Sequence, residues 1–449
     1  MNTNLLKKHF SLILLTLCYL FFAFYDGVIL SVDSPSYIDM YSSREPLYSL
    51  LIAFFRLICF NNSYYLNVLV IFQSLLTAFC VYSLIKFIVE EYELSFKSEA
   101  ILLLIHFGVI VLMRFVSKKG MLYSNTVLSE SITYPLYLLF FRYNLEYVLK
   151  GNKKPLIVAS IISFIMISAR KQMFLSLFML IISIVYVSFK NKNLIKGLFK
   201  VVAISCLIVG LSKGLDFLNQ KVINNFDSTH TLDNRFITTM IYYVGEDDDY
   251  KHINNQDSKE VFNIIYNSSK SNGYTYDENI ESWFARVKHF SSNYDNIQID
   301  TIIPETKKYV EKKYGLKDAL LEQKMDDINN NIIKDLLPIK CLQIAKVVFD
   351  SFLAGLMITI SADNSIFVIY AIFAYLVYFV LLVYSLKKNG LDKYSVLGIL
   401  VILSIFINVG IVSAVIFNQT RYTIYNFDLF YIGLYLLFLS LIKEKGIIK

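Results

Sequence analysis

Carboxylates and basic side chains gather in a short polar stretch that directly follows the first apolar segment of the chain. This stretch, VDSPSYIDMYSSREPLY at 32–48, holds Asp33, Asp39, Arg44 and Glu45. A carboxylate can remove a proton from a hydroxyl group, and an arginine can hold a phosphate through paired hydrogen bonds. Side chains of these two kinds indicate chemistry between a hydroxyl-bearing acceptor and a phosphate-bearing substrate.

Three later stretches place further charges at the ends of apolar segments. They are NTVLSESITYPLY with Glu130, SARKQMF with Arg170 and Lys171, and NQTRYTIYNF with Arg421. Two adjacent cations at a tight turn suit a phosphate or a pyrophosphate. The phenol of Tyr422, beside Arg421, suits stacking on a sugar or hydrogen bonding to it.

The segments that position these residues are those of a polytopic membrane protein. The 449 residues are 56% hydrophobic and only 18% charged, with a mean hydropathy of +0.51. A soluble domain is about 25% charged. The apolar residues form blocks about as long as a helix that crosses a bilayer. Hydropathy predicts ten spans, near 10–26, 64–87, 99–115, 127–148, 156–170, 173–189, 198–216, 366–386, 396–417 and 424–442.

The segment 341–360 is also apolar, but Lys346 and Asp350 lie in its first half. We interpret it as an interfacial or re-entrant helix rather than an eleventh span. The expected fold class is therefore an all-α polytopic membrane protein with about 10–11 transmembrane helices and a mainly helical extracytoplasmic insert. The first apolar segment lacks a cleavage site of small residues, so we expect it to be retained as a helix.

The distribution of charge orients the predicted spans. Most loops on one side are lysine-rich, which places them and both termini in the cytoplasm. The polar insert 217–340 carries 20 acidic and 15 basic residues, a net charge of −5, against +12 for the remainder, and we place it outside. The predicted organisation is a transmembrane module at 1–216 with a first outer loop at 26–62, an extracytoplasmic domain at 217–340 and a second transmembrane module at 341–449.

In this orientation the charged residues of the four stretches all fall at or near the external face. Asp26, Arg114, Lys118 and Lys119 fall there too. Cations on that side oppose the usual bias and need an explanation. Any one of them has a simpler interpretation as a contact to lipid headgroups, and the tyrosines as interfacial anchors. Because the set comes from separated parts of the chain, we favour a shared site.

Other chemistry has little support in the sequence. GEDDDYKH lacks the spacing of a calcium loop, and the histidines lack metal-ligand spacing. The five cysteines show no paired spacing, and no glycine-rich phosphate loop, nucleophile elbow or HExxH motif occurs. We therefore expect no protein-built metal centre.

The four stretches together resemble the GT-C superfamily of membrane glycosyltransferases, which use polyprenyl-phosphate-linked sugars. In DSPSYIDM…REPLYSLLIAFF, Asp33 and Tyr37 match the acidic residue and tyrosine of the first outer loop of that family, and Pro46 with Tyr48 matches its Pro-x-Tyr. VLSESITYPLYLLFF is similar to the start of the fourth helix of the family, with Glu130 in the acidic position. SARKQMF resembles its arginine-containing helix break, and TRY its late Arg-Tyr.

The resemblance implies roles for these residues. Asp33 would be the catalytic base of an inverting transfer; it is favoured over Asp26, which ends a membrane helix. The lipid phosphate would be held by Arg170, Lys171, Arg421 and Lys118. Further binding residues would be Tyr37, Arg44, Glu45, Glu130 and Tyr422. Asp33-Ser34 stands where the family commonly has Asp-Glu, so a divalent cation remains an open possibility and no other cofactor is implied.

The implied function is transfer of a sugar from a polyprenyl-phosphate donor to a cell-surface glycan or lipid-linked acceptor, outside a bacterial inner membrane. The polyprenyl chain would lie between the spans, and no nucleic acid is involved. A close alternative is an O-antigen or exopolysaccharide polymerase, which joins lipid-diphosphate repeat units. A third is a lipid-sugar flippase or transporter, which should carry ionisable residues near mid-membrane; the spans hold almost none.

Overall fold

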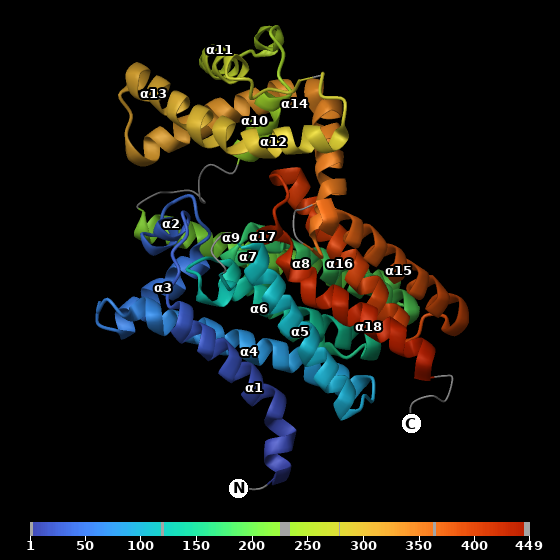
Figure 1. The fold of residues 1–449 in the computed structure, drawn as a ribbon. Helices are drawn as coiled ribbons and strands as arrows, with labels where there is room; N and C mark the ends of the chain where they lie inside the picture. The colour runs from blue at the N-terminus through green and yellow to red at the C-terminus, as the bar shows by residue number, and fades with distance from the viewer. Residues whose placement is uncertain (1–2, 118–120, 225–233, 278, 362–364, 444–449) are drawn as a thin grey trace. The chain divides into compact units, whose positions relative to one another are not determined.

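The computed structural model describes residues 3–117, 121–224, 234–277, 279–361 and 365–443 (Figure 1). Over these ranges the fold is all-α, as predicted, without a strand; one isolated bridge joins Ile29 and Thr126. The chain divides into two compact units. The first comprises Met1–Asn219, Met357–Asn408 and Thr420–Lys449, and the second Gln220–Leu356 and Val409–Gln419.

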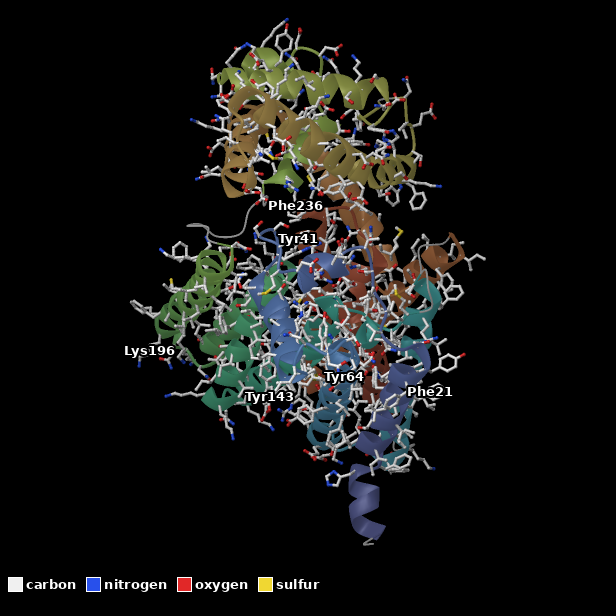
Figure 2. All side chains as sticks on the ribbon, turned by 90° about the vertical axis from the view of Figure 1, so that its left-hand side faces the viewer. Phe21, Tyr41, Tyr64, Tyr143, Lys196 and Phe236 are labelled. Atoms are coloured by element: carbon white, nitrogen blue, oxygen red, sulfur yellow. The ribbon has the colours of Figure 1, made fainter. Side chains whose placement is uncertain are left out.

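The described helices of the first unit contain most of the apolar segments. They are α1 (Thr3–Asp26), α2 (Ser34–Ile38), α3 (Pro46–Ile58), α4 (Tyr65–Glu91), α5 (Phe96–Val116), α6 (Glu130–Lys150), α7 (Lys153–Ala169), α8 (Phe174–Lys190), most of α9 (Leu194–Ile223), α15 (Ser365–Asn389), the larger part of α16 (Lys393–Val415), α17 (Thr420–Thr423) and α18 (Phe427–Lys443). Exposed aromatic side chains include Phe21 of α1 and Tyr41 of the following loop (Figure 2).

Nine helices within the described ranges are long and apolar enough to cross a membrane, as a multi-pass membrane protein requires. They are His9–Asp26, Tyr65–Glu91, Phe96–Val116, Lys171–Lys190, Leu194–Ile223, Leu320–Ile358, Ile366–Asn389, Lys393–Val415 and Thr420–Ile442. Eight of them correspond to predicted spans. The ninth is the apolar part of α14 (Asp318–Ile358), a continuous helix that contains most of the segment expected to be interfacial.

The predicted spans at 127–148 and 156–170 are helices, α6 and α7, but neither is among the nine. α7 has only 17 residues. α6 is rich in tyrosine and other polar side chains, and it packs against α4, α7 and α8 with most of its side chains buried. A helix surrounded by protein rather than lipid tolerates such residues, so hydropathy is a weak signal for it.

The second unit is a helical domain with its own core. Its helices are α10 (Arg235–Tyr243), α11 (Gln256–Ser271), α12 (Trp283–Ile297), α13 (Ile303–Tyr314) and most of α14. The rings of Tyr242, Phe262 and Tyr266 stack in series within this core, with centroids 5.2 and 5.6 Å apart. The buried side chains of α14 that join it extend from Leu321 to Val347.

A charge cluster ties three helices of this unit together. Asp257 of α11 is buried and accepts hydrogen bonds from Lys313 at 2.8 Å and Tyr314 at 2.5 Å, and Lys324 lies 3.1 Å away. Burial alone would raise the pKa of Asp257, but these donors outweigh it and hold the pKa well below its ordinary value. The carboxylate is therefore ionised at every physiological pH.

Replacing Asp257 by asparagine should destabilise the second unit by about 2 kcal/mol, because charge-assisted hydrogen bonds are lost. A carboxylate whose pKa is lowered by folding stabilises the protein above its unfolded pKa, about 3.9, and loses that effect as the pH falls below it. The wild-type unfolding temperature should therefore drop on acidification below about pH 4, and this contribution should be absent from Asp257→Asn. Equal acid sensitivity of the two proteins would contradict the assignment.

Candidate functional site

The first outer loop is attached to the start of α6 by backbone pairing. α1 ends at Asp26, and Gly27 adopts the left-handed φ of +65°, which turns the chain out of the helix. The N–H of Ile29 then donates to the carbonyl of Asn125 at 3.0 Å, and the N–H of Val127 donates to Ile29 at 3.0 Å. The loop at 27–45 is thereby held beside the residues that precede Glu130.

Side chains of α2 strengthen this attachment. The Ser34 hydroxyl donates to the carbonyl of Val127 at 2.9 Å, and the Tyr37 hydroxyl lies 3.1 Å from that of Ser129. Tyr37 is buried, with its ring edge-on to that of Tyr48 at 5.2 Å. α2 has Pro35 in its first turn, and α3 begins at Pro46; both prolines suit a helix start.

Two carboxylates and three guanidinium groups alternate at the centre of the site. Asp33 pairs with Arg44 at 2.9 Å through one oxygen and with Arg421 at 2.7 Å through the other. Arg421 also pairs through its Nε with Glu130, and the second oxygen of Glu130 pairs with Arg170 at 2.9 Å. The order Arg44–Asp33–Arg421–Glu130–Arg170 joins residues from four separated parts of the sequence.

The two carboxylates differ in their surroundings. The side chain of Glu130 is fully buried, whereas that of Asp33 is 32% exposed. Burial alone would raise the pKa of Asp33, but Arg421 and Arg44 outweigh it and hold the pKa below its ordinary value. Glu130 is therefore enclosed by protein, and Asp33 is the carboxylate of the two that a molecule in solution can reach.

Aromatic rings support the three guanidinium groups. Arg44 lies 4.8 Å from the centre of the Tyr37 ring, and the ring of Tyr422 lies 5.3 Å from Arg170 and 5.7 Å from Arg421. Such cation–π contacts hold a guanidinium in place without neutralising its charge. The arginines can thus exchange a carboxylate partner for another anion while they stay fixed.

The structure brings together most of the residues singled out in the sequence. Asp33, Tyr37, Arg44, Glu130, Arg170, Arg421 and Tyr422 share the contacts described above. Glu45 accepts a hydrogen bond at 3.0 Å from the backbone N–H of Lys171, so the start of α3 lies beside the turn that carries Lys171. Lys118 and Lys119 lie outside the described residues. Arg114 instead pairs with Asp26 and covers the Phe22 ring at 4.6 Å, which forms a separate pair.

Several uncharged residues of the site were missed in the sequence. Gln172 accepts from Arg170 at 3.0 Å and donates to Asn408 at 2.8 Å and to the Tyr422 carbonyl at 2.6 Å. Ser129 accepts from Arg170 at 3.0 Å. Gln172 adjoins the cation pair in SARKQMF, which was a usable signal, whereas Asn408 lies inside an apolar segment and gives none.

Within the described ranges, no group of three or more His, Cys, Asp or Glu side chains is arranged to hold a metal ion. At this site the two carboxylates are bridged by Arg421. The positive charge between Asp33 and Glu130 is therefore that of a guanidinium group.

The expectation of almost no ionisable residues inside the spans needs a correction. His106 of α5 and Asp428 of α18 are both buried and lie 2.8 Å apart. Tyr19 and Tyr134 are hydrogen bonded to this pair. Hydropathy averages hide single polar residues, and His106 and Asp428 are 322 positions apart in the sequence.

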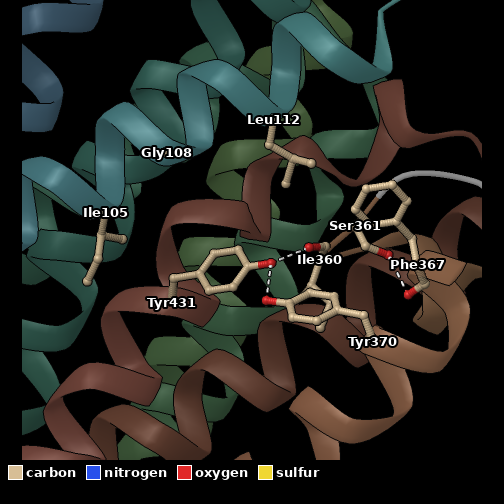
Figure 3. A pocket seen from close by; sticks show the side chains of 8 residues that line it. All are labelled: Ile105, Gly108, Leu112, Ile360, Ser361, Phe367, Tyr370 and Tyr431. Atoms are coloured by element: carbon tan, nitrogen blue, oxygen red, sulfur yellow. Dashed lines mark hydrogen bonds between the residues drawn. The ribbon is translucent and has the colours of Figure 1, made fainter.

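An apolar pocket of about 370 Å³ lies elsewhere in the first unit (Figure 3). Ile105, Gly108 and Leu112 of α5 form one wall, and α15, α18 and Ile360 with Ser361 form the rest. The hydroxyls that line it have partners: those of Tyr370 and Tyr431 are hydrogen bonded to each other at 3.1 Å, and Tyr431 donates to the Ile360 carbonyl at 2.5 Å. Ser361 donates to the carbonyls of Met357 and Phe367. The remaining surface suits a hydrocarbon chain.

Comparison of the chain with protein-family models, with curated proteins and with solved structures found no match of any of the three kinds. A function can therefore be inferred only from the residues and their arrangement.

Proposed function

We propose that the protein is a membrane glycosyltransferase that moves a sugar from a polyprenyl-phosphate donor to a glycan or lipid-linked acceptor. The observation that carries this proposal is the alternating cluster of Asp33 and Glu130 with Arg44, Arg421 and Arg170. It combines a reachable carboxylate with guanidinium groups suited to a phosphate. The charge bias of the loops favours an extracytoplasmic site, in a bacterial inner membrane.

The charge of the cluster favours a monophosphate donor. Three arginines and two carboxylates leave one positive charge. A sugar attached to a polyprenyl monophosphate is a phosphodiester with one negative charge, whereas a diphosphate carries two. The monophosphate therefore balances the cluster. Lys171 and Glu45, which are joined beside the cluster, add one charge of each sign and leave this balance unchanged, so a polymerase that acts on lipid-diphosphate repeat units would need a further cation.

In the proposed reaction, Asp33 takes the proton of an acceptor hydroxyl as that oxygen attacks the anomeric carbon. The bond between this carbon and the phosphate oxygen breaks, and its electron pair leaves with the lipid phosphate. Arg421, Arg170 and Lys171 stabilise the charge that develops on that phosphate. Attack opposite to the leaving group inverts the anomeric configuration. Arg421 and Arg44 hold Asp33; a bound phosphate competes for Arg421 and frees the base.

The polyprenyl chain of the donor has a matching place in the apolar pocket beside Gly108. A Cβ atom added at Gly108 meets no atom within 4 Å, and Gly108 lines the pocket, so Gly108→Leu adds apolar volume at the pocket wall. Since glycine in a helix interior costs about 1 kcal/mol, the variant should be at least as stable as the wild type. We expect its KM for a long-chain donor to rise several-fold, with little change for a farnesyl-phosphate-linked donor.

Gly210→Leu is the matched control, because a Cβ atom added at Gly210 of α9 also meets no atom within 4 Å and Gly210 does not line the pocket. It should leave both KM values unchanged. An equal effect of Gly108→Leu on long and short donors, or no effect on either, would show that the pocket does not hold the chain.

The test of the proposed function is the lipid content of a deletion strain. A transferase predicts accumulation of the sugar-charged polyprenyl monophosphate, identified by mass spectrometry, and its disappearance when the wild-type gene is restored. Accumulation of a lipid-diphosphate oligosaccharide repeat unit would instead identify a polymerase. An unchanged lipid profile would contradict both.

A further inference from the structure

A buried polar seam runs from the candidate site into the first unit along one face of α6. Glu130 pairs with Arg421, the Thr133 hydroxyl lies 2.9 Å from that of Tyr425, and Tyr134 donates to the carboxylate of Asp428. The α6 residues at 130, 133 and 134 share a face because they are three and four positions apart. Their partners at 421, 425 and 428 follow in the same order.

Side-chain contacts of this seam must fix the position of α6 relative to the α17–α18 segment, because the backbone on both sides of the seam is irregular. Pro135 lies inside α6 and cannot donate a hydrogen bond to the carbonyl of Ser131, which weakens the first turn. Opposite it, the chain passes from α17 through a 3₁₀ turn at Ile424–Asn426 before α18 begins at Phe427. No continuous helix therefore fixes where Arg421 stands relative to Glu130.

Asp428 is the inner anchor of the seam. It is the second residue of α18, and its side chain is almost completely buried. One oxygen accepts from Tyr134, and the other lies 2.8 Å from Nδ1 of His106 on α5. The other ring nitrogen of His106 lies 2.9 Å from the hydroxyl of Tyr19 on α1. A buried carboxylate with two such partners has one favourable position, and it connects four helices.

We propose that Asp428 is a positioning residue for the candidate site: through Tyr134 and His106 it sets the register between α6 and the α17–α18 segment, and so places Arg421 on Glu130 and Asp33. The activity part of this inference rests on the proposed function, but the register does not. Asp428 contacts no substrate; it acts through Arg421, seven residues earlier in the chain.

Double-mutant cycles on thermal unfolding test the register without a ligand. The full-length protein in nanodiscs is compared as wild type, Asp428→Asn, Arg421→Gln and the double variant. Residues in one network are not additive. We expect Asp428→Asn to lower the unfolding temperature when it is introduced into the wild type. When it is introduced into the Arg421→Gln variant, the decrease should be less than half as large. Fully additive shifts would overturn the proposal.

Glu99→Gln provides the matched control. Glu99 of α5 is also buried and also bonds across to α1, through Ser11, but its described contacts do not reach α6 or α18. The decrease in unfolding temperature caused by Glu99→Gln should be the same in the wild type and in the Arg421→Gln variant. If Asp428→Asn does not fold, Tyr134→Phe removes the outer bond of Asp428 and is used in the same cycle, with the same expected loss of additivity.

The kinetic readout separates positioning from loss of stability. We expect Asp428→Asn to raise the KM for the lipid donor about tenfold, and Glu99→Gln to leave it unchanged at a comparable unfolding temperature. If the wild type transfers no sugar, the proposed function fails while the unfolding cycle still decides the register. Transfer with an unchanged donor KM in Asp428→Asn would refute positioning even where the cycle is not additive.

Discussion

Replacing Arg421 by glutamine is expected to abolish sugar transfer and to lower the free energy of unfolding by about 3 kcal/mol. The guanidinium pairs with both Asp33 and Glu130, and the Glu130 side chain is fully buried. Breaking a buried ion pair by removing one partner is strongly destabilising, because the remaining charge loses its compensation. The loss would be measured by chemical unfolding and by transfer from a polyprenyl-phosphate donor.

Two further variants separate charge compensation from catalysis. Adding Glu130→Gln to Arg421→Gln removes the buried carboxylate but also deprives Arg170 of its partner, so stability should return only in part while transfer remains absent. Arg114→Gln breaks another ion pair at a helix end, with Asp26, and should retain transfer because that pair lies apart from the site. An Arg421→Gln protein that keeps both stability and transfer would show that the cluster is not the functional centre.

Asp33→Asn is expected to reduce kcat about a thousandfold with little loss of stability. A positioned general base contributes about 10²–10⁴ to the rate, and asparagine cannot accept the proton. Because the Asp33 side chain is 32% exposed, the energetic cost of losing its ion pairs is reduced by solvent. Asp39→Asn, in the same loop and exposed, is the control that should transfer normally.

The pH dependence of transfer gives a second readout for Asp33. The pKa of this carboxylate is held below its ordinary value, about 3.9, by Arg421 and Arg44 against the opposing effect of burial. It therefore stays ionised as the pH falls from 7 to 5, and transfer should not decline over that range through loss of the base. A steep decline of kcat on acidification near pH 6 in the wild type, absent from residual Asp33→Asn activity, would show that the pKa of Asp33 is raised rather than lowered and would contradict this account of the base.

The sequence contained enough information to find most of the cluster. Positive charges at boundaries where the positive-inside bias disfavours them drew attention to Arg44, Arg170 and Arg421, and these arginines do meet around Asp33 and Glu130. These positions were informative because a cation in an unfavourable place needs a partner. Which carboxylate each arginine would select was not predictable, because Arg421 and Glu130 are 291 residues apart.

Features without a charge or a hydropathy signal were missed. Hydropathy predicted a span at 127–148, where α6 lies. Because other helices enclose α6, it tolerates polar side chains, and it is not among the nine apolar helices. Gln172 and Asn408 join the site as neutral side chains, one of them from within an apolar helix. The break between α17 and α18 depends on tertiary contacts such as that of Tyr425 with Thr133, which no local pattern specifies.

In the proposed function, the protein transfers one sugar, with Asp33 in its cluster of arginines as the base. The most direct test of this function is linkage analysis of the surface glycans and glycolipids from the wild-type strain, the deletion strain and a strain expressing Asp33→Asn at wild-type level. The account predicts that the deletion and Asp33→Asn strains lose the same single glycosidic linkage, while glycan chain length is unchanged. A full complement of linkages in the Asp33→Asn strain, with a linkage missing from the deletion strain, would contradict it.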